Sequence, residues 1–69
     1  MKNLMMETVY GEIDKATTWK HLHKVDGMLE MFFLMINTND ITYQDYQELC
    51  SARERRFRRI ANGEFVKHL

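Results

Sequence analysis

Apolar residues recur every three or four positions along most of the chain, which is the spacing of amphipathic α-helices. The first such segment covers residues 4–16, where the charged residues lie away from the apolar stripe. Its stripe consists of Met6, Val9, Tyr10, Ile13 and Ala16. Gly11 weakens this helix because glycine has a low helix propensity. The pattern nevertheless predicts an N-terminal helix with one buried side.

The next segment predicts two helices that are separated at Asp26. Thr17 or Thr18 is a suitable N-cap for the first, short helix. Its apolar residues are Trp19, Leu22 and Val25. Asp26 is a good N-cap for a second helix, which is expected from Gly27 to about Asn37. This helix is apolar nearly all round and must be covered on more than one side. We expect the N-terminal helix to cover the face formed by Leu29, Phe33 and Ile36.

The longest helix is expected from Thr42 to about Asn62. Residues 37–40 precede it and favour local side-chain to backbone bonds, which is typical of a loop. Thr42 and Asp45 form an acidic variant of the capping box. Gly63 can supply the left-handed residue that ends the helix. The apolar stripe consists of Tyr46, Leu49, Cys50, Phe57 and Ile60.

The length of 69 residues allows one domain at most, and a chain this short buries only about 60% of its unfolded surface. The patterns predict an all-α fold, a small single-domain bundle of about four helices over residues 1–69. The apolar stretch 28–36 is shorter than the roughly 20 residues of a membrane span. The start lacks the apolar region of a secretion signal, and the lone Cys50 fits a reducing compartment. We therefore expect a cytoplasmic protein that does not contact a membrane.

Charge is unevenly distributed although the formal net charge is zero. Residues 1–24 carry four lysines and three acids, and residues 25–52 carry five acids and no lysine or arginine. Residues 53–69 carry six cations and two acids. The segments therefore differ in net charge, at +1, −5 and +4. Such polarity bears on partners and on association, although solvated helix faces give the same pattern.

Arrangements that support catalysis are missing. Cys50 has no base near it in the sequence, since His21, His23 and His68 are far away, and a nucleophile needs an oriented base. His21 and His23 lie two positions apart, so on a helix they diverge by roughly 200° and cannot clasp one metal ion. No glycine-rich phosphate loop is present. We expect a protein that is not an enzyme and has no catalytic residue, metal ligand or cofactor.

The long helix is dense in arginine. Three of its arginines project away from the apolar stripe, namely Arg55, Arg58 and Arg59, and Arg56 lies near the edge of the stripe. Such a helix can bind phosphates or pair with an acidic partner surface. Arg53 falls in the middle of the stripe. It is expected either to extend its charge to solvent or to pair with a carboxylate such as Glu30, and we favour pairing.

The segment 50–65 has a pattern that resembles the centre of a known family. Ser51 and Ala52 are followed by an acid at Glu54, by Arg56, and by apolar residues at Phe57 and Ile60. In this it is similar to the Hha/YmoA family, small helical modulators in enterobacteria and their plasmids that associate with the nucleoid protein H-NS. Upstream, Asp40-Ile41-Thr42 and Leu22-His23-Lys24-Val25 also match family segments. The resemblance covers about residues 18–65.

This sequence departs from the family at several points. Leu29 and Phe32 occupy positions of the second helix where the family has acids implicated in partner binding. Arg53 replaces a small residue, and the family's terminal segment with its proline and tryptophan is absent. Residues 1–16 form an extra N-terminal helix. The resemblance therefore transfers best to Glu54 and poorly to the acids of the second helix.

The resemblance implies a modulator of gene expression that binds an H-NS-type silencer and adds basic surface for DNA contact. We expect the acids Glu54, Asp45 and Glu48 to bind the partner, and Arg55, Arg58 and Arg59 to contact nucleic acid. DNA would then be bound indirectly or weakly, at the nucleoid, and a homodimer is left open. The alternatives are a direct, non-specific nucleic-acid-binding helical protein and a phage- or plasmid-encoded inhibitor of another host protein, which would bind through the Met-rich helix.

Overall fold

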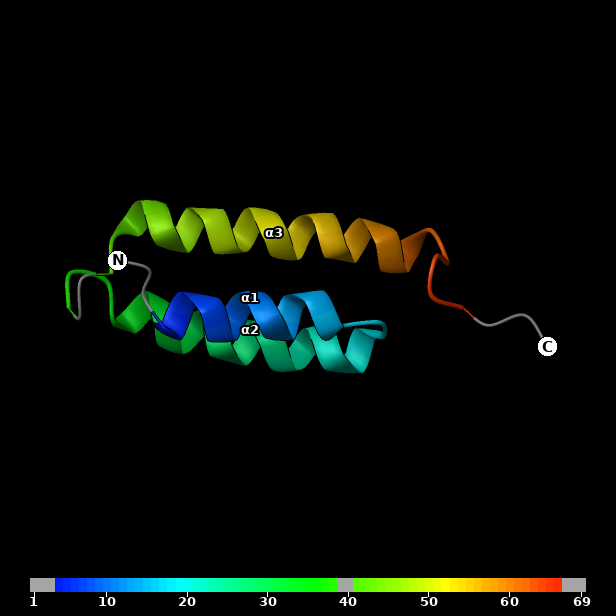
Figure 1. Ribbon diagram of the computed structural model, residues 1–69, viewed down its shortest axis with the longest axis horizontal. Helices are drawn as coiled ribbons and strands as arrows, with labels where there is room; N and C mark the ends of the chain where they lie inside the picture. Colours follow the sequence, from blue (N-terminus) through cyan, green and yellow to red (C-terminus); the bar gives the residue numbers. More distant parts are fainter. Residues whose placement is uncertain (1–3, 39–40, 67–69) are drawn as a thin grey trace.

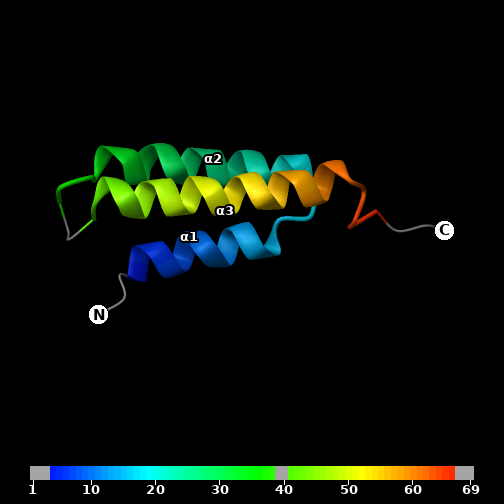
Figure 2. The same ribbon diagram turned by 90° about the horizontal axis from the view of Figure 1, so that it is seen from above.

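A computed structural model describes residues 4–38 and 41–66, and this part of the chain folds into three α-helices. The helices are α1 (Leu4–Lys15), α2 (Trp19–Leu34) and α3 (Tyr43–Ala61). They run up, down and up, so that α1 and α3 point in the same direction and α2 in the opposite one (Figures 1 and 2). Each helix contacts the other two. The all-α prediction is confirmed, but the described residues form three helices and not about four.

The difference in helix number arises at Asp26. The sequence predicted a helix end and a new N-cap there, yet α2 continues unbroken through this position. The carboxylate of Asp26 does not cap a helix, because it accepts two hydrogen bonds from the guanidinium of Arg53. Gly27 costs only about 1 kcal/mol relative to alanine, which is too little to end a helix whose inner side is packed. The two expected helices are therefore one.

The helices begin and end largely at the capping residues that the sequence predicted. Thr18 accepts a hydrogen bond of 3.3 Å from a backbone N–H one turn later, as an N-cap does. Thr42 and Asp45 form a reciprocal capping box, with hydrogen bonds of 3.0 and 3.2 Å. Gly63 follows α3 with a φ of 73°, a left-handed conformation that glycine adopts without steric cost.

The connection between α2 and α3 is closed by local hydrogen bonds. The N–H of Asn37 donates to the carbonyl oxygen of Ile41 at 2.8 Å, and Asn37 itself has a φ of 70°. The hydroxyl of Thr38 donates to the carbonyl oxygen of Met35 at 2.6 Å. Residues 39–40 of the predicted loop lie outside the described residues. The side chain of Ile41 is buried in the core, so this connection packs against the helices.

The core lies where the apolar stripes of the three helices meet. Its buried members are Val9, Ile13, Ala16, Leu22, Val25, Leu29, Phe32, Ile41, Leu49, Ala52 and Ile60. Burial of one large side chain of this kind contributes about 1.5–3 kcal/mol. The prediction that α1 covers Leu29 together with Phe33 is wrong for Phe33. That residue is half exposed, and its ring packs on Tyr46 of α3 with 5.1 Å between the ring centroids.

Candidate interaction surfaces

Arg53 links α3 to α2 near the middle of the bundle. Its Nε and Nη2 atoms donate to Oδ1 and Oδ2 of Asp26 at 2.8 and 3.0 Å. Glu54 adds a carboxylate oxygen 3.8 Å from Nη1 of Arg53. Arg53 therefore pairs with a carboxylate, as favoured from the sequence, but its partner is Asp26 and not Glu30. We call Asp26, Arg53 and Glu54 the charged cluster.

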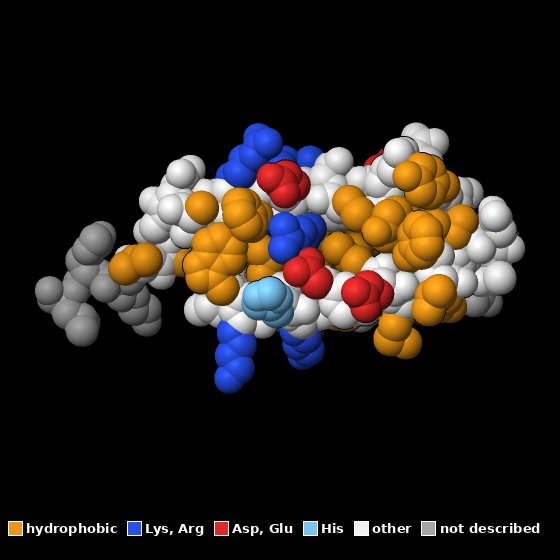
Figure 3. All heavy atoms as spheres, turned by 180° about the vertical axis from the view of Figure 1, so that it is seen from behind, with side chains coloured by type: hydrophobic (Ala, Val, Ile, Leu, Met, Phe, Trp, Pro, Cys, Tyr) orange, Lys and Arg blue, Asp and Glu red, His pale blue; other side chains and the backbone are white. Residues whose placement is uncertain are grey.

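Two apolar patches flank the charged cluster on the face that α2 and α3 share. In Figure 3 they are the orange groups on either side of the blue and red side chains in the centre of the view. The Trp19 patch consists of Trp19 and Phe57, whose ring centroids are 4.9 Å apart. The Phe33 patch consists of Phe33, Leu34, Tyr43 and Tyr46. Together with the charged cluster, these two patches define the α2–α3 face.

The three acids predicted to bind a partner do not share one surface. Glu54 belongs to the α2–α3 face, where its other oxygen is 3.8 Å from Nε of Arg58. Asp45 takes part in the capping box. Glu48 lies on another side of α3 and lines a polar hollow of about 460 Å³ between α1 and α3, which we call the α1–α3 hollow. Its lining residues are Tyr10, Gln44, Gln47, Glu48, Ser51 and Arg55.

Arg56 has a structural role that the sequence analysis missed. Its Nε and Nη2 atoms donate to the carbonyl oxygens of Ala16 and Asp14 at 2.7 and 2.6 Å. These hydrogen bonds satisfy acceptors at the end of α1, where a helix leaves its last carbonyl groups without partners. The guanidinium carbon also lies 4.3 Å from the centroid of the Phe65 ring. No local pattern could have indicated these hydrogen bonds, because Ala16 and Asp14 lie 40 and 42 positions before Arg56 in the sequence.

The arginines predicted to contact nucleic acid differ in how freely they can do so. Arg59 is held by a bidentate ion pair with Glu64, at 2.9 and 2.6 Å, and stacks on Phe65. This hydrogen bonding raises the pKa of Arg59 and lowers the pKa of the Glu64 carboxyl. Arg58 is 73% exposed, and Arg55 is also exposed at the rim of the α1–α3 hollow. Arg55 and Arg58 are therefore the arginines of this set best placed to reach a phosphate.

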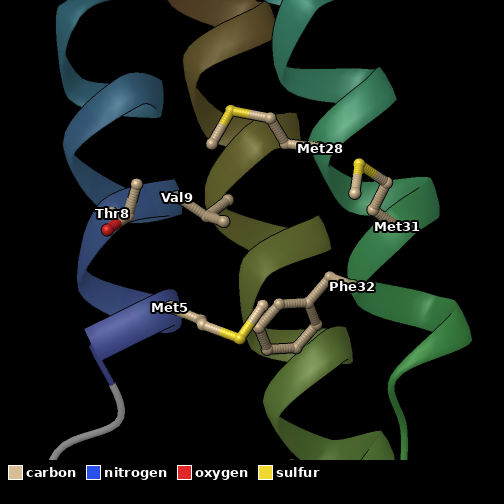
Figure 4. Close-up of a pocket in the computed structure, with 6 residues that line it drawn as sticks. All are labelled: Met5, Thr8, Val9, Met28, Met31 and Phe32. Carbon is tan, nitrogen blue, oxygen red and sulfur yellow. The ribbon is translucent and has the colours of Figure 1, made fainter.

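A groove of about 210 Å³ runs between α1 and α2, and its lining is almost wholly apolar. Three side chains come from each helix, namely Met5, Thr8 and Val9 from α1 and Met28, Met31 and Phe32 from α2 (Figure 4). The side chain of Met5 reaches toward the ring of Phe32 across the groove. Met31 stands at the outer edge and is 67% exposed. The flexible methionines make the groove adaptable in shape.

Two further sets of titratable side chains interact within the bundle. Glu12 lies 3.6 Å from His21 and 3.4 Å from Lys24, and the hydrogen bond to Lys24 lowers the pKa of Glu12. Tyr46 is hydrogen-bonded to Cys50, which together with burial raises the pKa of the tyrosine. Within residues 4–38 and 41–66, no three His, Cys, Asp or Glu side chains are grouped so that they could hold a metal ion. No helix in the same residues has the length and apolar character needed to cross a membrane.

No family model, curated protein or solved structure matches the chain. The functional argument therefore rests on the residues of this chain and on the surfaces that they form.

Proposed function

We propose that the protein is a modulator of gene expression that binds an H-NS-type silencer and adds arginine side chains to the DNA contacts of the complex. The observation that carries this proposal is the separation of charge along α3. Glu48 lies in the first half of α3, and Arg55 and Arg58 lie in the second. Glu48 and Arg58 are about 15 Å apart along the axis at 1.5 Å per residue. Glu48 can thus meet a protein at one place on the helix and Arg58 can meet DNA at another, while Arg55 lies between them at the rim of the α1–α3 hollow.

The acidic end of α3 suits a basic protein surface. Residues 25–52 contain no lysine or arginine, so no cation of that segment competes with a basic residue of the partner for the carboxylates. Glu48 lies at the α1–α3 hollow, where glutamine and serine side chains offer further hydrogen bonds. Charged rims of this kind contribute mostly to association rate and selectivity. Asp45 adds charge while capping α3, whereas Glu54 contributes less because Arg53 and Arg58 already face it.

The basic end of α3 supports a supplementary DNA contact and not independent DNA binding. Arg56 and Arg59 are held within the chain, which leaves Arg55 and Arg58 as exposed cations of the cluster. Each phosphate contact changes the slope of log K against log salt by about 0.9. Two added contacts therefore steepen the salt dependence of the complex by roughly two units.

A second candidate function is inhibition of another host protein, and the α1–α2 groove favours it. Methionine-rich apolar grooves accept helical segments of varied sequence. A partner of that kind would insert an apolar side chain beside Met28 and Met31, independently of Glu48. Substitutions in the groove and in the α1–α3 hollow therefore separate the two functions.

Titration of the purified chain with a purified H-NS-type silencer tests the main proposal. Glu48→Gln removes one charge while preserving shape, and we expect it to weaken binding to the silencer by about tenfold or more. Glu30→Gln is the matched control, because it removes the same charge on α2, away from the α1–α3 hollow. The proposal is rejected if the wild-type chain does not bind the silencer, or if both variants bind as tightly as the wild type.

The proposed contact with DNA is tested by a second measurement, on the complex of the chain with the silencer. Replacement of both Arg55 and Arg58 by glutamine should reduce the salt slope of DNA binding by roughly two. Because Arg55 also lines the α1–α3 hollow, Arg58→Gln alone is the variant expected to leave the affinity for the silencer unchanged, and it should reduce the salt slope by about one. Lys20→Gln removes a cation from α2 as a control. An unchanged salt slope in the double variant would show that these arginines do not contact DNA.

A further inference from the structure

The α2–α3 face exposes three aromatic side chains and one leucine. Trp19 is 47% exposed, Phe33 and Tyr43 are exposed by about half, and Leu34 is 80% exposed. These four are among the seven large apolar side chains exposed in the described part of the chain. Clustered exposed apolar surface with a polar centre is typical of a protein interface. We propose that this face binds a second copy of the chain, with the helices of the two copies antiparallel.

The order of features along the α2–α3 face makes it self-complementary. The Trp19 patch lies at one end, the Phe33 patch at the other, and the charged cluster between them (Figure 3). The proposed two-fold axis lies in the interface, perpendicular to the helices, and passes near Asp26. It places the Trp19 patch of each copy on the Phe33 patch of the other. Both apolar patches are then covered at once, as in the isologous interfaces of symmetric dimers.

Charge selects the antiparallel arrangement over the parallel one. In a parallel dimer the acidic ends of the two faces, with Glu30, would lie together, and so would the arginine-rich ends of α3. In the antiparallel dimer each acidic end lies beside the basic end of the other copy. With the axis near Asp26, Glu30 of one copy faces His23 of the second copy. Such complementary arrangements fix the register of an interface and disfavour the alternative one.

Gly27 provides an independent reason to place another helix against α2. It stands in the interior of α2 and is exposed, and a Cβ built on it meets no atom within 4 Å. Packing within the chain therefore gives no reason for a residue that weakens the helix. In the proposed dimer Gly27 lies next to the two-fold axis, where the two α2 helices come closest. The missing side chain then permits close approach of the helices.

The α2–α3 face is a broad side of the molecule (Figure 3). Helices α2 and α3 have 16 and 19 residues, or roughly 24 and 28 Å at 1.5 Å per residue, so the face is long enough to hold an apolar patch at each end and the charged cluster between them. The α1–α3 hollow with Glu48 lies outside the α2–α3 face. Dimerisation therefore leaves the surface of the proposed function open.

Sedimentation equilibrium of the full chain tests the dimer directly. We expect the mass to rise from 8.4 kDa toward twice that value as concentration increases. Leu34→Glu should raise the dimer dissociation constant by about tenfold or more, because it places a charge in the Phe33 patch. Met31→Glu is the matched control on the same helix, since Met31 is similarly exposed but faces the α1–α2 groove. Circular dichroism establishes that both variants remain folded.

Two further variants test the arrangement of the copies. Gly27→Ala should leave the fold of one chain intact, or stabilise it, while weakening the dimer. A mixture of His23→Cys and Glu30→Cys chains should form a crosslinked dimer on oxidation more readily than either variant alone, and the wild type controls for Cys50. Equal crosslinking of the mixture and the single variants would overturn the antiparallel register.

The dimer and the proposed function fail separately. A wild-type chain that stays monomeric at every concentration overturns the dimer, as does equal dimerisation by Leu34→Glu and Met31→Glu. If the chain is monomeric and Leu34→Glu instead abolishes binding to the silencer, the α2–α3 face belongs to that partner. Loss of silencer binding in Glu48→Gln alone, with dimerisation unchanged, supports both proposals.

Discussion

Arg56 ties the second half of α3 to the end of α1, and its replacement by methionine should remove a large share of the stability. Methionine keeps most of the apolar stem but removes the two hydrogen bonds to Ala16 and Asp14 and the contact with Phe65. Hydrogen bonds that involve a charged group contribute about 1.5–3 kcal/mol each, and an exposed cation–π contact about 0.5–1 kcal/mol. Because the bond to Asp14 is exposed, we expect a loss of about 2–3 kcal/mol.

The size of this loss is measurable because a domain of 69 residues is stabilised by only about 3.5–10 kcal/mol in total. Urea unfolding followed by circular dichroism should show a lower midpoint for Arg56→Met, and Tm should fall by about 10–20 °C. Arg58→Met is the control, because Arg58 is largely exposed and its loss should change stability by less than about 0.5 kcal/mol. Equal unfolding midpoints for the two variants would refute the tie between α3 and α1.

Three further predictions concern stability. Asp26→Asn should cost about 1–2 kcal/mol in urea unfolding, less than the roughly 3–5 kcal/mol of a fully buried pair, because Asp26 and Arg53 are partly exposed; an unchanged midpoint would contradict this. Gly11→Ala should raise the free energy of unfolding by up to about 1 kcal/mol, since a Cβ there meets no atom within 4 Å, and a lower value would mean that α1 needs the glycine. The pKa of Glu64 is lowered in the folded chain, so its ionised form stabilises the fold above the ordinary pKa of about 4.3, and this contribution is lost as pH falls through the lowered pKa. The urea midpoints of wild type and Glu64→Gln should therefore differ at neutral pH and converge in acid, and a constant difference would refute the linkage.

Features that depend on a few neighbouring residues could be predicted from the sequence. The capping box joins residues three positions apart, so Thr42 and Asp45 were sufficient to place the start of α3. Gly63 marked the end of the same helix because its backbone conformation is a local property. The all-α fold followed from periodicity, which samples one helix at a time.

Features that depend on pairing across the chain could not be predicted in the same way. The ion pair of Asp26 and Arg53 spans 27 residues, and without it Asp26 looked like an N-cap. Which candidate arginines are available to a partner depends on Glu64 and Phe65, which follow the end of α3 and fold back on its last turns. Once Glu64 and Phe65 are seen to hold Arg59, Arg55 and Arg58 remain as the exposed pair.

The up-down-up order of the helices also has consequences for how the chain folds. Contacts between consecutive helices need only short loops to close, and chains with mostly local contacts fold in microseconds to milliseconds. The hydrogen bonds of Arg56 to Ala16 and Asp14 join residues 40 and 42 positions apart, so they close a much longer loop. We expect the α2–α3 hairpin to form first and α1 to dock on it afterwards. The hydrogen bonds of Arg56 at the end of α1 would then slow the unfolding of the native bundle. They would have little effect on the rate of folding.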